Sequence, residues 1–221
     1  MTNPTNEHLA DQTPVIQVTI AASPDAVWHA LRTREALHEW HGWQGDDLDD
    51  EIDLIYFREA IETDPGRSIT LGGGDRVEIS PDGESTRVRL TRAPSADEPD
   101  RASFYGEITE GWVTFLHQLK FALEHHPGET RRTLFYSGHG DPPDADALIA
   151  GEPWFRTDHQ RGTRVPDWGG GLLITARNLS KQTAMAVLTT YRLDDQAANT
   201  LDAAGRAWWT RRHPPQDTEP S

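Results

Sequence analysis

The segment from Thr109 to Gly128 constrains the fold most strongly, because it joins a helical period to a sharp stop. Thr109 can cap a helix, and the negative charge of Glu110 suits the first turn. The run His125-His126-Pro127-Gly128 then ends the pattern. Between these ends, apolar residues recur at steps of three and four, as in an amphipathic helix with one side buried. The members of this stripe are Trp112, Phe115, Leu116, Leu119, Ala122 and Leu123.

The composition excludes several classes of function. The chain has 221 residues and a net charge of −15, which repels the phosphate backbone of nucleic acids. Cysteine is absent, so disulfides, thiol catalysis and zinc–thiolate sites are excluded together. No stretch approaches the roughly 20 apolar residues that cross a bilayer, and the polar N-terminus has no signal-like apolar run. We therefore expect a cytoplasmic protein that binds neither nucleic acid nor membranes.

The first block of predicted elements begins with a strand at residues 14–20, in which Ile16, Val18 and Ile20 alternate with polar residues. Ser23-Pro24-Asp25 is typical of a helix start, and we expect that helix to run from residue 24 to about residue 40. Pro81-Asp82-Gly83-Glu84 indicates a hairpin turn. Further alternating or apolar runs predict strands at 51–57, 68–71, 76–80, 86–91 and 102–108.

The second block begins near residue 129. Residues 138–171 are rich in Gly, Pro and Asp and are expected to be mostly loop, with a short helical turn near 144–150. Residues 1–12 and 213–221 are polar and are expected to be a mobile leader and tail. No internal repeat is evident in the sequence. The remaining runs predict strands at 130–137, 172–176 and 184–193 and a last helix that begins after Asp194 or Asp195 and includes Trp208.

Two short motifs offer chemistry but lack a diagnostic spacing. His38 and His41 are three residues apart on a predicted helix and could share a metal, but a polar helix end is the favoured explanation. Residues 137–141 contain Ser, His and Asp, but on an extended segment such alternating side chains point one way and do not converge as a triad does. We therefore expect no metal site and carry no catalytic residue forward.

Glycine runs and a cluster of acidic residues are expected to be structural. The runs at 72–74 and 169–171 lack the residues of a phosphate-binding loop and suit tight turns. The acidic run at 46–51 lacks the spacing of a calcium loop and is expected to be a solvated loop.

Several motifs together resemble the START/SRPBCC superfamily. Residues 22–31, followed by Trp40, resemble the start of such a domain, most closely in the branch related to the activator of the 90-kDa heat-shock chaperone ATPase. Residues 86–91 resemble a late strand of that family, and 111–120 resemble the start of its closing helix. The resemblance covers residues 14–127. The second block is similar to a C-terminal extension of some bacterial members.

The resemblance implies an α+β helix-grip fold, in which a curved antiparallel sheet holds a long helix and leaves a cavity between them. The expected divisions are a helix-grip domain at 13–128 and a smaller α+β extension at 129–212. The superfamily includes carriers, receptors, cyclases and chaperone co-factors, so the fold alone implies no single activity.

We expect a small hydrophobic molecule to bind in that cavity, without a cofactor, in a stress-related or chaperone-linked role. An enzyme of cyclase or hydrolase type is less expected; it would use the same cavity, with Glu107 or His117 as acid or base. A chaperone co-factor that acts through its surface is the other alternative. For any single aromatic residue, plain core is the favoured interpretation. The candidate ligand-binding residues are Trp28, Trp40, Phe57, Tyr105, Trp112, Phe115, Leu116 and Leu119.

Overall fold

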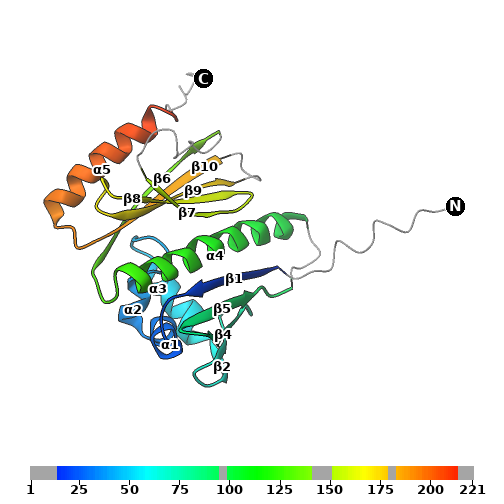
Figure 1. Cartoon of the computed structure of the whole chain (residues 1–221). Helices are drawn as coiled ribbons and strands as arrows, with labels where there is room; N and C mark the ends of the chain where they lie inside the picture. The colour runs from blue at the N-terminus through cyan, green and yellow to red at the C-terminus, as the bar shows by residue number, and fades with distance from the viewer. Residues whose placement is uncertain (1–13, 95–98, 141–150, 179–182, 214–221) are drawn as a thin grey trace.

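The computed structural model describes residues 14–94, 99–140, 151–178 and 183–213, and within the helix at 99–125 it describes side chains from residue 106 onward. The predicted leader, the predicted helical turn at 144–150 and nearly all of the predicted tail lie outside these ranges. Figure 1 shows four layers, in the order sheet, long helix, sheet, helix. Within the described residues, no helix is long and apolar enough to cross a membrane.

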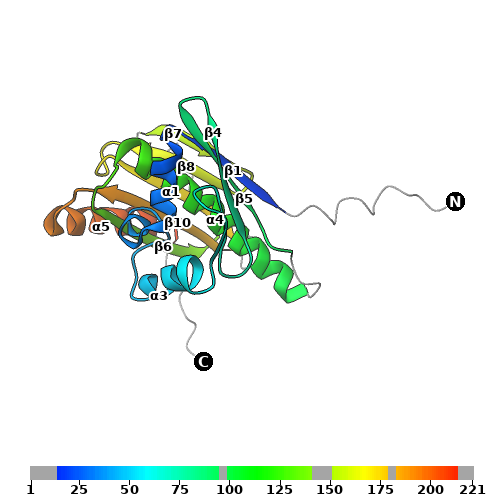
Figure 2. The same cartoon turned by 90° about the horizontal axis from the view of Figure 1, so that it is seen from below.

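The first unit runs from β1 to α4. Its antiparallel sheet has the strand order β1-β5-β4-β3-β2, so the first strand pairs with the last. The helices between β1 and β2 lie together at one end of this sheet, as Figure 2 shows from below. Its elements are β1 (Val15–Ile20), α1 (Pro24–Arg32), α2 (Arg34–His38), α3 (Leu48–Asp53), the π-helix η1 (Leu54–Arg58), β2 (Ile61–Asp64), β3 (Ser68–Thr70), β4 (Arg76–Asp82), β5 (Ser85–Thr91) and α4 (Pro99–His125).

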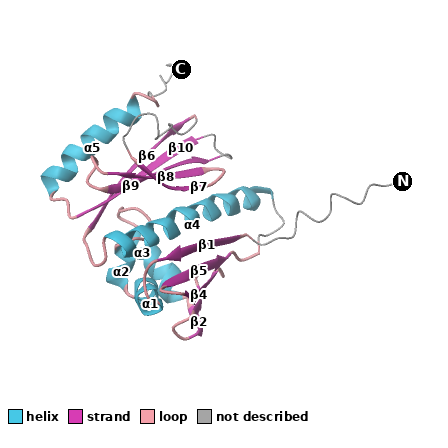
Figure 3. Cartoon of the chain, in the orientation of Figure 1, coloured by secondary structure: helices cyan, strands magenta, loops and turns pink. Residues whose placement is uncertain are grey.

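The second unit runs from β6 to α5 and repeats this topology. Its sheet has the order β6-β10-β9-β8-β7, in which the first strand again pairs with the last and the other strands form a meander. A helix again follows the last strand (Figure 3). The structure therefore contains a topological repeat that the sequence did not reveal. The elements are β6 (Arg131–His139), β7 (Glu152–Arg156), β8 (Gln160–Val165), β9 (Gly171–Asn178), β10 (Thr183–Tyr191) and α5 (Asp195–Thr210).

Helix α4 packs between the two sheets. On the first-sheet side, Lys120 donates from Nζ to the carbonyl oxygen of Thr19 at 2.7 Å. On the second-sheet side, the Thr114 hydroxyl donates to Oε1 of Gln160 at 2.8 Å. Leu172 and Ile174 of β9 belong to the same core cluster as α4 and the first sheet. The helix-grip α+β arrangement is thus confirmed, and the division of the chain into two domains at residue 128 stays a prediction.

Three predicted segments have a different secondary structure. The helix expected at 24–40 is two helices, because Thr33 between them has an extended backbone. The strand expected at 51–57 is helical: Ile52 and Tyr56, one turn apart, are both buried in α3 and η1. The acidic run at 46–51 is therefore partly in α3 and not wholly in a loop, since carboxylates suit a first helical turn.

Two further boundaries were wrong. Residues 102–108 belong to α4 and not to a strand, so the helix begins ten residues before the expected cap at Thr109. Residues 138–171 include β7 and β8, which the Gly and Pro content had suggested to be loop. In both cases pairing or packing with distant segments prevailed over local composition.

Candidate functional site

The predicted ligand-binding residues lie in the core of the first unit. Leu116 and Leu119 are fully buried, and Trp40 and Trp112 are 1% and 5% exposed. Three more candidates, Trp28, Phe57 and Phe115, are partly buried and pack against the same core cluster. The side chain of Tyr105 lies outside the described residues.

The two buried indoles have protein partners for their N–H groups. Trp40 donates from Nε1 to the carbonyl oxygen of Ala30 at 2.9 Å. Trp112 donates from Nε1 to Oδ2 of Asp75 at 2.8 Å, and the same carboxylate accepts from Arg92 at 2.5 Å and from the backbone N–H of Ala93. Buried polar groups of tryptophan require such partners. These contacts stabilise the core, and ligand contact by these residues stays a prediction.

A buried chain of hydrogen bonds joins Glu51, His41 and Tyr56. Nε2 of His41 lies 3.2 Å from Oε1 of Glu51, and Nδ1 lies 3.0 Å from the hydroxyl of Tyr56. Burial lowers the pKa of His41, so the imidazole is neutral, donates from Nε2 to the carboxylate and accepts from Tyr56 at Nδ1. The hydrogen bond from His41 lowers the pKa of Glu51, and burial raises the pKa of Tyr56 well above its usual value.

This arrangement could relay a proton, but Tyr56 has no exposed surface through which a substrate could reach its hydroxyl. His38 was the other histidine of the candidate metal pair. Its Nε2 lies 2.9 Å from Oδ1 of Asp49, and it does not share a site with His41. In the part of the chain that the structure describes, no three His, Asp or Glu side chains are placed to hold a metal ion. We therefore assign the relay a structural role.

The acid–base candidates Glu107 and His117 lie on α4. His117 faces the second sheet, where its ring stacks on Phe155 with ring centroids 3.6 Å apart. Burial lowers the pKa of His117 to about 4. Its position therefore differs from the one expected for an acid or base between α4 and the first sheet. Glu107 is partly exposed near the start of the helix.

The Ser, His and Asp motif at 137–141 lies at the end of β6. The carbonyl oxygen of Ser137 accepts from Nε1 of Trp209 at 3.3 Å, and that of His139 lies 2.9 Å from Nδ1 of His213. Asp141 lies outside the described residues. The described contacts of this motif are thus backbone contacts that hold the end of α5.

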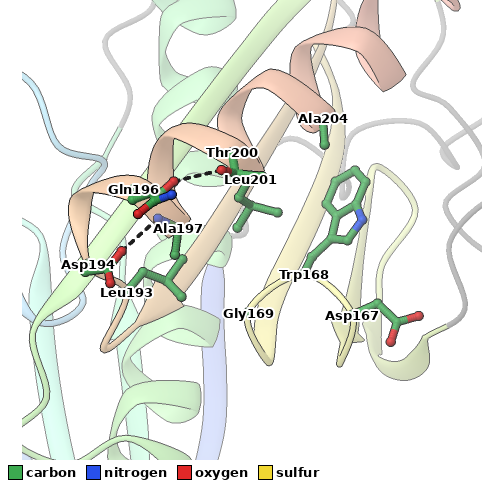
Figure 4. A pocket seen from close by; sticks show the side chains of 10 residues that line it. All are labelled: Asp167, Trp168, Gly169, Leu193, Asp194, Gln196, Ala197, Thr200, Leu201 and Ala204. Carbon is green, nitrogen blue, oxygen red and sulfur yellow. Dashed lines mark hydrogen bonds between the residues drawn. The ribbon is translucent and has the colours of Figure 1, made fainter.

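A groove of about 530 Å³ lies in the second unit, between α5 and the turn that joins β8 to β9 (Figure 4). Trp168 lines it from the turn, and Leu193 lines it from the segment before α5. Small side chains of α5 form the opposite wall. The ten lining residues are Asp167, Trp168, Gly169, Leu193, Asp194, Gln196, Ala197, Thr200, Leu201 and Ala204.

The groove follows from the uneven packing of α5. Near its C-terminal end, Trp208 and Trp209 are buried and hold the helix on the second sheet. Ala197 in the first turn and Ala204 in the second half of the helix carry small side chains that line the groove. Trp168 meets Trp208 edge to face with ring centroids 5.6 Å apart, which fixes one edge of the indole.

The segment before α5 is held rigidly. Asp194 is the N-cap, and its Oδ1 accepts from the backbone N–H of Ala197 at 2.8 Å. Arg132 of β6 donates from Nε to the carbonyl oxygen of Leu193 at 3.1 Å and pairs with Asp195. These contacts predefine the groove wall before any ligand binds.

None of the seven predicted ligand-binding residues with described side chains lines this groove. The sequence contained the helix, its cap and the glycine run at 169–171 as separate features. Only the Trp168 side chain, next to that glycine run, could have drawn attention to the turn. The pairing of β8 with β9 brings residues 167–169 against α5, and this places the helix, its cap and the glycine run at one groove.

Comparisons with known proteins report similar folds in solved structures. No family model matches the sequence, and no curated protein matches it. The solution structure of an Aha1 dimer from Colwellia psychrerythraea is 20% identical and covers 53% of this chain and 99% of its own, with a TM-score of 0.41. Aha1 represents the chaperone-activator branch that the sequence motifs resemble.

Two other similar structures extend over both units. DynU16, a putative protein in the dynemicin biosynthetic locus, is 14% identical and covers 90% of this chain and 95% of its own, with a TM-score of 0.39. The di-domain ARO/CYC BexL from the BE-7585A biosynthetic pathway is 14% identical and covers 90% and 92%, with a TM-score of 0.40. These are distant likenesses, and the function is argued from this chain's own residues.

Proposed function

We propose that this protein binds a small, mainly apolar molecule in the groove beside α5. The observation that carries the proposal is the groove itself, whose volume of about 530 Å³ lies within the range of about 300–1,000 Å³ common for ligand sites. Its lining combines an indole and aliphatic side chains with a few polar groups, which is the usual composition of such sites.

The comparison with the first unit supports this location. There, the space between α4 and the sheet is occupied by core side chains, including Trp112 and Leu116. In the second unit, the space between α5 and the β8–β9 turn is open, and α5 contributes the small side chains of Ala197 and Ala204 to its lining. The predicted cavity is thus proposed for the second unit and not for the first.

The alternatives from the sequence stay predictions. An enzyme would need an acid, base or nucleophile in the groove, and the described lining supplies the carboxylates of Asp167 and Asp194 without a histidine. A chaperone co-factor would act through a surface, and the groove does not bear on that role.

The test is binding of a neutral aromatic probe, 2-(2-naphthyl)ethanol, followed by calorimetry and by the melting temperature. Ligand at 100 times its Kd should stabilise the folded protein by about 2.7 kcal/mol. Ala204→Trp places a bulky side chain in the groove and should abolish binding. Ala203→Trp, at the neighbouring exposed position outside the lining, is the matched control and should bind normally.

Two results would contradict the proposal. One is the absence of saturable binding by the unmodified protein. The other is equal affinity in Ala204→Trp and Ala203→Trp while both variants remain folded, which would place the probe elsewhere on the molecule.

A further inference from the structure

We infer that the natural ligand of this groove is an organic cation, namely an apolar or aromatic body that carries a protonated amine. This inference deepens the proposed function and rests on it. It concerns the charge of the ligand, which the size and apolar character of the groove do not define.

The first argument is the charge of the lining. Asp167 and Asp194 contribute carboxylates from different elements, the β8–β9 turn and the start of α5, and both are exposed. Figure 4 shows them at opposite ends of the row of labelled side chains. The ten lining residues include no Lys, Arg or His. A ligand between the two carboxylates therefore lies in a negative potential, which attracts cations.

The second argument concerns the N-terminus of α5, whose N-cap Asp194 belongs to the groove lining. A free helix N-terminus attracts anions. Here, however, the Asp194 carboxylate occupies the cap and accepts from Ala197, and Asp195 adds a second negative charge to the first turn. The chain's own carboxylates thus already satisfy the helix end, and an anionic ligand would be repelled by them.

The third argument is the position of Arg132, a cation that contacts the segment before α5. Arg132 lies behind the wall, where it holds the carbonyl oxygen of Leu193 and pairs with Asp195. It is not among the lining residues, so it does not neutralise Asp167 or Asp194 toward the groove. Asp167 has no ion-pair partner within the described residues.

The fourth argument is the aromatic surface of Trp168. The face of an indole attracts a cation placed within about 6 Å of the ring centroid. Figure 4 shows the Trp168 ring directed toward α5, so a protonated amine in the groove can contact this aromatic face. The net charge of −15 favours the same ligand class over fatty acids and other anions at long range.

The experiment compares three probes with one naphthyl body and different charge: 2-(2-naphthyl)ethylamine, 2-(2-naphthyl)ethanol and 3-(2-naphthyl)propanoate. At low ionic strength the amine should bind about 5–10-fold more tightly than the alcohol, and the carboxylate more weakly than the alcohol, as expected for two exposed charge contacts. Added salt should reduce these differences.

The charge variants locate the effect. Asp167→Asn and Asp194→Asn should each lower the ratio of the amine affinity to the alcohol affinity by about 2–5-fold. Asparagine is also a good N-cap, so Asp194→Asn preserves the helix start. Asp158→Asn removes an exposed carboxylate from the turn between β7 and β8, outside the lining, and is the matched control that should leave the ratio unchanged.

The outcomes separate the two proposals. If all three probes bind equally and Ala204→Trp abolishes binding, the groove is a ligand site but the inference of a cationic ligand is wrong. Tighter binding of the carboxylate, or an unchanged ratio in both groove variants, overturns the inference in the same way. If no probe binds, or if Ala204→Trp has no effect, the proposed function itself fails.

Discussion

The two units have the same strand order but differently filled interiors. In the first unit, residues 21–60 between the first and second strands form α1, α2, α3 and η1, which add Leu31, Trp40 and Tyr56 to the core. In the second unit, only residues 140–151 separate the corresponding strands. The longer insertion supplies large side chains that fill the core of the first unit.

The helices that follow the last strand of each unit, α4 and α5, also differ in how much of their surface is covered. Helix α4 is covered on both sides by sheets, whereas among the described residues α5 has a sheet on one side and leaves its other side exposed (Figure 1). One topology can therefore produce a solid core or an open groove. The side chains around the last helix of each unit determine which of the two forms. Three predictions test this contrast.

The largest effect is expected for Trp112→Ala in the filled unit. Removal of a buried indole leaves a cavity and an Asp75 carboxylate without one of its donors, so the free energy of unfolding should fall by about 3–5 kcal/mol. Leu201→Ala at the groove should cost about 1 kcal/mol, since this side chain already borders an open space. Urea unfolding followed by circular dichroism measures both.

Trp112→Phe is the control, because it keeps an aromatic ring and removes only the N–H donor. A cost below about 0.5 kcal/mol for Trp112→Ala would show that the ring is on the surface and that the first unit is not filled.

The second effect is a loss of stability at mildly acidic pH, caused by His117 between α4 and the second sheet. Its pKa of about 4 in the folded state lies below the usual value near 6.5, so the unfolded state binds the proton more readily. Stability should therefore fall as the pH decreases from 6.5 toward 4, by about 2 kcal/mol at pH 5. Urea unfolding at pH 7 and pH 5 measures this loss.

His117→Phe retains the stacking on Phe155 and removes the titration, so the loss between pH 7 and pH 5 should shrink by most of that amount. His41, whose pKa is also lowered by burial, should account for part of the remaining dependence. If the free energy of unfolding of His117→Phe depends on pH as in the unmodified protein, protonation of His117 does not cause the loss of stability.

The smallest effect compares two helical glycines. A Cβ at Gly205 of α5 would lie 2.2 Å from the buried Tyr136 hydroxyl, whereas a Cβ at Gly111 of α4 would meet only Phe115 at 3.9 Å. Gly111→Ala should stabilise the protein by up to about 1 kcal/mol through helix propensity. Gly205→Ala should destabilise it by about 1 kcal/mol, since overpacking exceeds that gain.

Thermal unfolding of both variants gives the sign directly. In a Tyr136→Phe background the cost of Gly205→Ala should decrease, because the nearest clashing atom is absent. Equal stabilisation by both alanines would show that α5 does not approach Tyr136 closely and that the end of the groove is less firmly fixed than described.

Much of the local structure was predictable from the sequence. The alternation of Thr86, Val88 and Leu90 correctly assigned the buried face of β5. Ser23 was recognised as a helix cap, and Asp194 was one of two expected caps for the last helix; both side chains accept the expected backbone hydrogen bond. Features of this kind depend on residues a few positions apart, so the pattern itself contains the information.

The site was not predictable in the same way. The aromatic candidates with described side chains pack into the first core, while the groove is formed by residues 167–169, residues 193–194 and five residues of α5, which come from separate elements. Contacts between distant segments can depend on a single residue. The side-chain amide of Gln44 forms hydrogen bonds with the backbone of Arg131 and Thr133 and covers the free edge of β6. Nothing in the sequence near Gln44 indicates that partner.

The sequence by itself determined which segments are amphipathic, where two of the helices begin, and that a sheet with a long helix would form the first unit. Only the tertiary structure decided that the same strand order recurs, that α4 is buried on both sides, and that the open space lies beside α5. The physical reason is that local patterns define which face of each element is apolar, whereas the space left between faces depends on the volumes of side chains that meet only after folding.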